Sequence, residues 1–127
     1  MIVADASAVV SGLLNAGPAR ELLARERLHV PHLADVEVAS ALRRAVGASR
    51  ITAAEGWSVL DTWRHLGVTR HAAPGLLDRV WQLRANVTAY DATYVALAEA
   101  LGCALVTADG RLTRASGIAC PVTVVPR

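Results

Sequence analysis

Short apolar runs, separated by longer amphipathic stretches, make up most of this chain. Most of the runs hold three or four residues rich in Val, Ile, Leu and Ala, which is the length and composition of a buried strand. Runs that are apolar throughout, without alternation, are typical of parallel strands covered on both faces. The pattern predicts five strands, at residues 2–4, 28–30, 68–70, 104–107 and 122–125.

The stretches between these runs repeat apolar residues every three to four positions and carry helix start and stop signals. Ser7 is placed to cap the first helix, and Pro18 opens a second one that runs toward Arg27. Thr52 and Glu55 form a capping-box pattern for a later helix. Further helical segments are predicted at 33–46, 52–66, 75–83, 89–101 and 110–115.

Alternation of strands and helices over 127 residues predicts one α/β domain, residues 1–127, with a mostly parallel sheet between helical layers. The hydrophobic fraction of 54% supports a packed core. Only five residues are aromatic and none is Phe, so Ala, Val and Leu must fill most of that core. Trp57 and Trp63 lie on the predicted 52–66 helix, where either one completes the core or anchors a partner.

The basic residues are all Arg, and the absence of Lys excludes a P-loop and Schiff-base chemistry. A net charge of +2 is compatible with a polyanionic partner without demanding one. Guanidinium groups contact phosphate well, although any single Arg can equally belong to a solvated helix face. The candidates for phosphate contact are Arg43, Arg44, Arg84 and Arg111.

Other residue types narrow the function further. Cys103 and Cys120 lack the spacing of zinc or thioredoxin-like motifs and are predicted to be buried free thiols. His29, His32, His65 and His71 show no ligand spacing and are expected at the surface or toward a partner. No targeting signal and no run of eighteen apolar residues is present, so we expect a soluble cytoplasmic protein with no membrane association.

Four acids stand out because of where they fall in the predicted fold. Asp5 and Asp109 each follow a strand, at the edge where open α/β sheets bind ligands, and Glu37 and Asp91 lie on helices. Carboxylates brought together repel one another unless a hard divalent cation with oxygen ligands lies among them. The pattern therefore predicts a site for Mg²⁺ or Mn²⁺, ions that organise phosphoryl chemistry.

Each acid also has an ordinary explanation. Asp5 can start a helix, Asp91 can complete a capping box with Thr88, and Asp109 precedes Gly in a common turn dipeptide. Asp35 complements a helix dipole. Glu37 fits such a structural role least well, because small residues surround it on its helix, and its ordinary alternative is an ion pair with a nearby Arg.

The same residues resemble the PIN-domain family, and most closely its VapC-type toxin ribonucleases. The resemblance is carried by IVADAS at 2–7, PHLADVEVASALRR at 31–44, TAYDATYVALAE at 88–99 and LVTADGRL at 105–112. These segments occur in the family's order over nearly the whole chain. The 88–112 region is the most specific part, and the region between 47 and 84 is compatible only in length and helicity.

The resemblance implies a three-layer α/β/α fold and an endoribonuclease. By it, Asp5, Glu37, Asp91 and Asp109 are the acidic quartet that binds Mg²⁺ or Mn²⁺ and activates water, and Ser7 and Thr107 support the site. It also implies an RNA substrate, a homodimer and a cognate VapB-type antitoxin.

Three other classes compete with this interpretation. Receiver domains share the length and topology but need a Lys after the last strand, and this chain has none. Haloacid-dehalogenase-like phosphatases need a second acid two positions after the first, where Ser7 stands. A non-catalytic RNA- or protein-binding module with structural acids is the remaining alternative, and metal-independent binding without cleavage would favour it.

Overall fold

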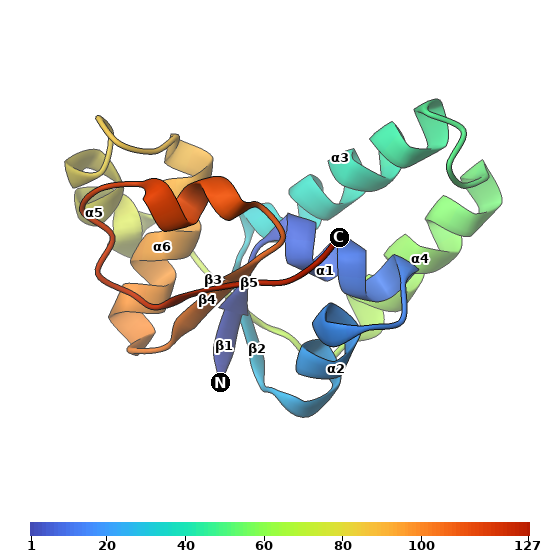
Figure 1. The fold of residues 1–127 in the computed structure, drawn as a ribbon, viewed down its shortest axis with the longest axis horizontal. Helices are drawn as coiled ribbons and strands as arrows, with labels where there is room; N and C mark the ends of the chain where they lie inside the picture. Colours follow the sequence, from blue (N-terminus) through green and yellow to red (C-terminus); the bar gives the residue numbers. More distant parts are fainter.

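Five parallel strands form the central sheet of the protein, which we describe from a computed structural model of all 127 residues (Figure 1). The strand order is β3-β2-β1-β4-β5, and every neighbouring pair is parallel. The predicted α/β class is therefore confirmed, with a sheet that is parallel throughout. The strands are β1 (Ile2–Ala4), β2 (Leu28–Pro31), β3 (Thr69–His71), β4 (Ala104–Thr107) and β5 (Val122–Val124).

Helices cover both faces of this sheet and make it the middle of three layers (Figure 1). On one side α1 packs on β1 and β4 and α3 packs on β2, with α2 against α1 and α4 against α3. On the other side α6 packs on β1, β2 and β4, and α5 lies against α6. The helices are α1 (Ala6–Leu14), α2 (Pro18–Arg25), α3 (Leu33–Gly47), α4 (Ala53–His65), α5 (Leu77–Gln82) and α6 (Ala89–Leu101), with 3₁₀ turns η1 (Pro74–Leu76) and η2 (Gly110–Arg114).

The order of the strands reverses at the centre of the sheet. The chain adds β2 and β3 on one side of β1 and then crosses over to place β4 and β5 on the other side. The carboxyl ends of β1 and β4 therefore flank a topological switch point, where doubly wound sheets bind their ligands. Asp5 and Asp109 follow these two strands.

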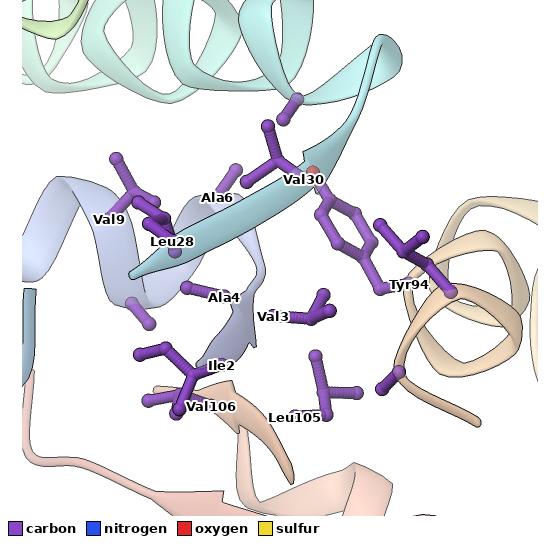
Figure 2. Close-up of a cluster of buried hydrophobic side chains, with 14 of the residues drawn as sticks. Ile2, Val3, Ala4, Ala6, Val9, Leu28, Val30, Tyr94, Leu105 and Val106 are labelled. Atoms are coloured by element: carbon purple, nitrogen blue, oxygen red, sulfur yellow. The ribbon is translucent and has the colours of Figure 1, made fainter. Parts of the chain in front are cut away.

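Strand β1 is buried on both faces, which explains why its sequence is apolar throughout. Val3 and Leu105 lie on the side of α6, whereas Ile2 and Val106 lie toward α1 (Figure 2). Helix α6 matches this burial, since its seven successive residues 92–98 are all buried. These two elements hold the start of α1 and the start of α6 in fixed positions beside the switch point.

Helix caps follow the sequence signals with one exception. Asp5, and not Ser7, caps α1 by accepting a hydrogen bond from the Ala8 backbone N–H, because Ser7 already lies in the first turn. The capping box of Thr52 and Glu55 is present at α4, which confirms that prediction. Helix α6 ends at Gly102, whose left-handed φ of 65° suits glycine.

Several predicted boundaries were wrong. Helix α2 ends at Arg25, short of Arg27, because the Arg27 carbonyl accepts the Ile2 N–H at the edge of the sheet. The third strand lies one residue later than predicted, since the β2 register pairs His29 with Thr69. The predicted 75–83 helix divides into η1, which begins at Pro74, and the shorter α5. Strand β5 ends at 124, not 125.

The two tryptophans of α4 have different environments. Trp63 is buried and its indole N–H donates to Asp35 at 2.8 Å, so it belongs to the core. Asp35 also forms an ion pair with Arg70 of β3. It therefore joins α3 to α4 and β3, a set of contacts that we call the Asp35 clamp, and does more than complement the dipole of its own helix. Trp57 is 58% exposed, which leaves it available to a partner.

The remaining candidate residues are only partly as expected. Cys103 and Cys120 are free but only half-buried, because both lie near the ends of strands. His32 and His65 are exposed, whereas His29 and His71 are half-buried and face each other with 2.9 Å between Nδ1 and Nε2. None of the helices has the length and apolar character that a membrane span requires.

Candidate active site

Asp5 is the most firmly held of the four acids. It is 7% exposed at the junction of β1 and α1, and both of its carboxylate oxygens accept hydrogen bonds. Oδ1 accepts from the Ser7 hydroxyl at 2.6 Å and from the Ala8 N–H at 3.0 Å, and Oδ2 accepts from the Thr107 hydroxyl. The direction of this carboxylate is thus fixed by the fold.

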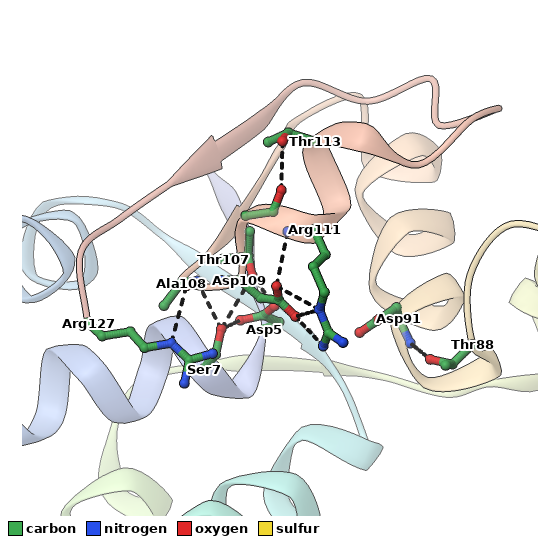
Figure 3. Close-up of polar contacts among 11 residues, drawn as sticks. Asp5, Ser7, Thr88, Asp91, Thr107, Ala108, Asp109, Arg111, Thr113 and Arg127 are labelled. Atoms are coloured by element: carbon green, nitrogen blue, oxygen red, sulfur yellow. Dashed lines mark hydrogen bonds and ion pairs between the residues drawn. The ribbon is translucent and has the colours of Figure 1, made fainter.

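The Ser7 and Thr107 hydroxyls join the first acid to the last (Figure 3). Each hydroxyl donates its proton to Asp5 and accepts a backbone N–H from the turn after β4. Ser7 accepts from Ala108 at 2.9 Å, and Thr107 accepts from Asp109 at 3.0 Å. Because each hydroxyl both donates and accepts a hydrogen bond, the two hydroxyls fix the spacing between the ends of β1 and β4.

Asp109 forms a bidentate ion pair with Arg111 (Figure 3). The Arg111 Nε and Nη2 atoms lie 2.9 and 2.6 Å from Oδ2, and Nε also lies 3.0 Å from Oδ1. These hydrogen bonds from Arg111 lower the pKa of Asp109 to about 2. Asp109 is therefore ionised at any physiological pH.

Asp91 and Glu37 behave in the opposite way. Burial raises the pKa of Asp91, and the charges of Asp5 and Asp109 raise it further. Burial also raises the pKa of Glu37, and the charges of Asp91 and Asp5 add to this increase. The four predicted acids thus lie within one another's electrostatic reach at the carboxyl edge of the sheet.

The alternative roles proposed for these two acids are only partly realised. Thr88 caps α6 by accepting the Asp91 N–H at 3.2 Å, but the Asp91 carboxylate makes no return bond to the Thr88 N–H. Glu37 forms no ion pair, since the neighbouring Arg44 donates instead to Ser40 at 3.0 Å. Both carboxylates therefore remain available to a ligand.

Arg111 is the cation within this acid cluster. It lies between Asp109 and Asp91 (Figure 3), and its charge lowers the pKa of Asp91. As the side chains stand, no three acidic, His or Cys groups are arranged to hold a metal ion together. The donor set is nevertheless all oxygen, which suits Mg²⁺ or Mn²⁺, and a guanidinium already occupies a position that favours positive charge. The residues present therefore fit a hard divalent cation, provided that Asp109 releases Arg111.

Sequence analysis did not identify Tyr94 as part of this site. Its side chain is 1% exposed, and its hydroxyl is the only buried side-chain polar atom without a hydrogen-bond partner. The signal was available, because Tyr94 lies three residues after Asp91 and so faces the same way on α6.

The candidate arginines divide into two groups. Arg111 and Arg44 lie close enough to the acids to change the pKa of Asp91 and of Glu37, respectively. Arg84 stacks on the Trp81 ring, 4.7 Å from its centroid, just before α6. Arg43 is exposed on α3 and makes no hydrogen bond or ion pair through its side chain.

Comparison with known proteins agrees with this architecture. The PIN-domain family matches residues 2–118, so the chain belongs to the PIN-domain family. The chain is 61% identical to "Ribonuclease VapC9" of Mycobacterium tuberculosis over 127 residues, which covers all of both proteins. It is also 44% identical to "Ribonuclease VapC1" of the same organism, over 97% of this chain and 96% of that protein. Within the PIN-domain family it is thus one of the VapC ribonucleases, as its sequence motifs predicted.

A solved structure supports the fold independently. "PAE2754" from Pyrobaculum aerophilum matches with a TM-score of 0.69 and 25% identity, over 95% of this chain and 81% of that one. The predicted three-layer α/β/α PIN-like fold is confirmed.

Proposed function

We propose that this protein is an endoribonuclease toxin of a VapBC-type pair that depends on Mg²⁺ or Mn²⁺ and hydrolyses RNA phosphodiester bonds. The observation that supports this most strongly is the convergence of Asp5, Glu37, Asp91 and Asp109 at the switch point of the sheet, with raised pKa values at Glu37 and Asp91. Carboxylates that are held close enough to raise one another's pKa values are typical of functional sites.

The four acids have different roles in the proposed reaction. Asp5 supplies a carboxylate whose direction Ser7 and Thr107 hold, and Asp109 supplies one that is ionised throughout. A divalent cation bound by the quartet would polarise the scissile phosphate and lower the pKa of the attacking water. Glu37 and Asp91 have raised pKa values, so they are the acids best suited to accept a proton from that water.

Arginine side chains on two sides of the acids are proposed to hold the RNA. Arg111, once released from Asp109, can pair with a phosphate, and Arg43 and Arg44 lie about two turns after Glu37 on α3. Arg84 and Trp81 together present a cation and an exposed aromatic face, the combination that holds unpaired nucleotides.

The proposed protein partners are a cognate VapB-type antitoxin and a second copy of this chain. Trp57 on α4 and Val36 on α3 are 58% and 72% exposed, and exposed large apolar side chains of this kind are typical of partner surfaces. Co-expression of the chain with the antitoxin, followed by light scattering of the toxin alone and of the complex, tests both assemblies. A monomer of the free toxin would contradict the homodimer.

The direct test of the activity is cleavage of a mixed cellular RNA pool by the purified protein with Mg²⁺, with Mn²⁺ and with a chelator. We expect cuts at a few defined sites that disappear with the chelator and in Asp91→Asn. The substitution Asp78→Asn is a matched control, because Asp78 is exposed on α5 and makes no hydrogen bond or ion pair with the quartet. Equal cleavage by wild type and Asp91→Asn would reject the quartet, and RNA binding without cleavage would favour the non-catalytic module.

A further inference from the structure

Tyr94 carries a polar group that the fold does not use. The residue is fully enclosed between α6 and the sheet, yet its hydroxyl makes no hydrogen bond. A buried donor without a partner destabilises a folded protein, so an unpaired hydroxyl in a native core needs an explanation. Phe would fill the same volume without this cost.

The buried hydroxyl lies close to Glu37 of the acid cluster. Figure 2 shows the ring extending from α6 toward β2, with its oxygen near Val30 of that strand. Glu37 lies one turn into α3, and its carboxylate is the main polar neighbour of the hydroxyl. Burial raises the pKa of Tyr94, and the facing Glu37 charge raises it further, so the hydroxyl keeps its proton.

The direction of that proton follows from the other neighbour. The Ala6 backbone N–H, at the start of α1, also faces the Tyr94 oxygen. First-turn N–H groups have no partner within their own helix and act as donors to nearby oxygens. The Tyr94 oxygen is thus placed to accept from Ala6, which leaves its proton to be donated to Glu37.

We propose that Tyr94 is a positioning residue: when the quartet holds its cation, the Tyr94 hydroxyl donates a hydrogen bond to the Glu37 carboxylate and holds it toward that cation. This inference rests on the proposed function. It assigns Glu37 the kind of support that Ser7 and Thr107 give to Asp5 on the other side of the site. Outer-shell hydrogen bonds of this kind orient metal ligands and change metal affinity.

The test is a double-mutant cycle on Mn²⁺ affinity, measured by isothermal titration calorimetry at one pH. The four proteins are wild type, Tyr94→Phe, Glu37→Ala and the double variant. We expect Tyr94→Phe to weaken Mn²⁺ binding by roughly tenfold or more, and to have no further effect when Glu37 is already Ala, which offers the hydroxyl no acceptor. A tyrosine that only fills space would not couple to Glu37.

Two further measurements separate the possible failures. Thermal unfolding in chelator should show Tyr94→Phe at least as stable as wild type, because the variant removes an unpaired buried hydroxyl. Glu37→Asp withdraws the carboxylate from the hydroxyl by one methylene, and should therefore also become insensitive to Tyr94→Phe.

Unchanged Mn²⁺ affinity in Tyr94→Phe, or the same loss in both backgrounds, would overturn the positioning role while leaving the quartet intact. A marked loss of stability of Tyr94→Phe in chelator would also overturn it, since the hydroxyl would then serve the core. If wild type, Asp91→Asn and Glu37→Ala bind Mn²⁺ equally, or none of them binds it, the proposed function itself fails.

Discussion

Thr107 connects two of the four acids through a single hydroxyl, which makes it the most informative residue for the rigidity of the site. It is fully buried, donates to Asp5 and accepts from the Asp109 N–H. Thr107→Val removes both bonds at constant shape and leaves the part-buried Asp109 N–H without its acceptor. We expect a loss of about 1–3 kcal/mol in the free energy of unfolding, measured by urea denaturation, together with weaker metal binding.

Thr107→Ser is the matched control, because it keeps the hydroxyl and removes only a methyl group. Its metal affinity should remain close to that of wild type. Equal loss of metal affinity in the Ser and Val variants would show that the hydroxyl does not position Asp5.

Asp91 provides a prediction about pH. Its pKa is raised in the folded protein, so the folded state holds the proton more tightly than the unfolded state does. The resulting destabilisation is fully present above the raised pKa, and it disappears as the pH falls below the ordinary range of a carboxyl group. Asp91→Asn should therefore raise the melting temperature of the chelated protein at neutral pH by a few degrees.

Differential scanning calorimetry over a range of pH checks this directly. The advantage of Asp91→Asn should shrink toward acidic pH, and added Mn²⁺ should stabilise wild type much more than the variant. If the stability difference instead grows as the pH falls, the raised pKa of Asp91 is not what destabilises the folded protein, and the prediction is wrong.

At the scale of single residues, the position of the four acids at one edge of the sheet was predictable, because they follow strands or lie near the start of apolar helices. Arg111 was predictable as a phosphate-binding candidate, but its ion pair with Asp109 was not, since a flexible side chain two residues away has many possible partners. Tyr94 was missed because an aromatic residue in an apolar helix is, in most proteins, simply part of the core.

At the scale of elements, α3 is held in place by the Asp35 clamp, which is only two residues from Glu37. Asp35 accepts from Trp63 of α4 and from Arg70 of β3, so it joins three elements. Asp35→Ala leaves the buried Trp63 N–H without a partner and should cost about 1–3 kcal/mol of unfolding free energy. Asp35→Asn keeps an acceptor for Trp63 and should cost less in the same urea titration.

If the two Asp35 variants lose the same stability, the ion pair with Arg70, and not the bond from Trp63, is the main interaction. No change in either variant would mean that packing alone sets the position of α3.

The segment from α5 to α6 carries a prediction about RNA. Arg84 stacks on exposed Trp81 immediately before the helix that holds Asp91. Arg84→Ala should weaken binding of a single-stranded RNA by roughly tenfold and reduce the dependence of binding on salt. Fluorescence anisotropy at several salt concentrations measures both effects.

Arg25→Ala is the control for this experiment. Arg25 is exposed at the end of α2, just before β2 begins, and so lies at the amino ends of the strands, away from the carboxyl ends where the acids lie. Equal weakening by both substitutions would mean that RNA binding depends on total charge rather than on this surface.

Elements were predicted well where the apolar pattern is strong and poorly where it is interrupted. Strand β1 and helix α6 follow directly from buried runs with clear caps. The end of α2 and the register of β3 depended on hydrogen bonds to distant parts of the chain, such as that from Ile2 to Arg27, which no local pattern encodes. The cap of α1 was misassigned because Asp5 and Ser7 are both good cap residues.

At the scale of the whole molecule, the reversal of strand order between β1 and β4 creates the site. It brings residues 5 and 109, which lie far apart in the chain, to one edge, while α3 and α6 deliver Glu37 and Asp91 from opposite faces of the sheet. Alternation of elements was enough to predict a mostly parallel sheet between helical layers, but it does not encode the strand order that creates the site. The extent of the domain, the homodimer and the cytoplasmic location remain predictions.

The central claim is that these four acids bind one or more divalent cations, and anomalous diffraction from crystals grown with Mn²⁺ tests it most directly. We predict an anomalous peak among the carboxylates of Asp5, Glu37, Asp91 and Asp109, with Arg111 displaced from Asp109. Manganese bound only elsewhere, or an intact ion pair between Arg111 and Asp109 with no peak among the acids, would contradict it.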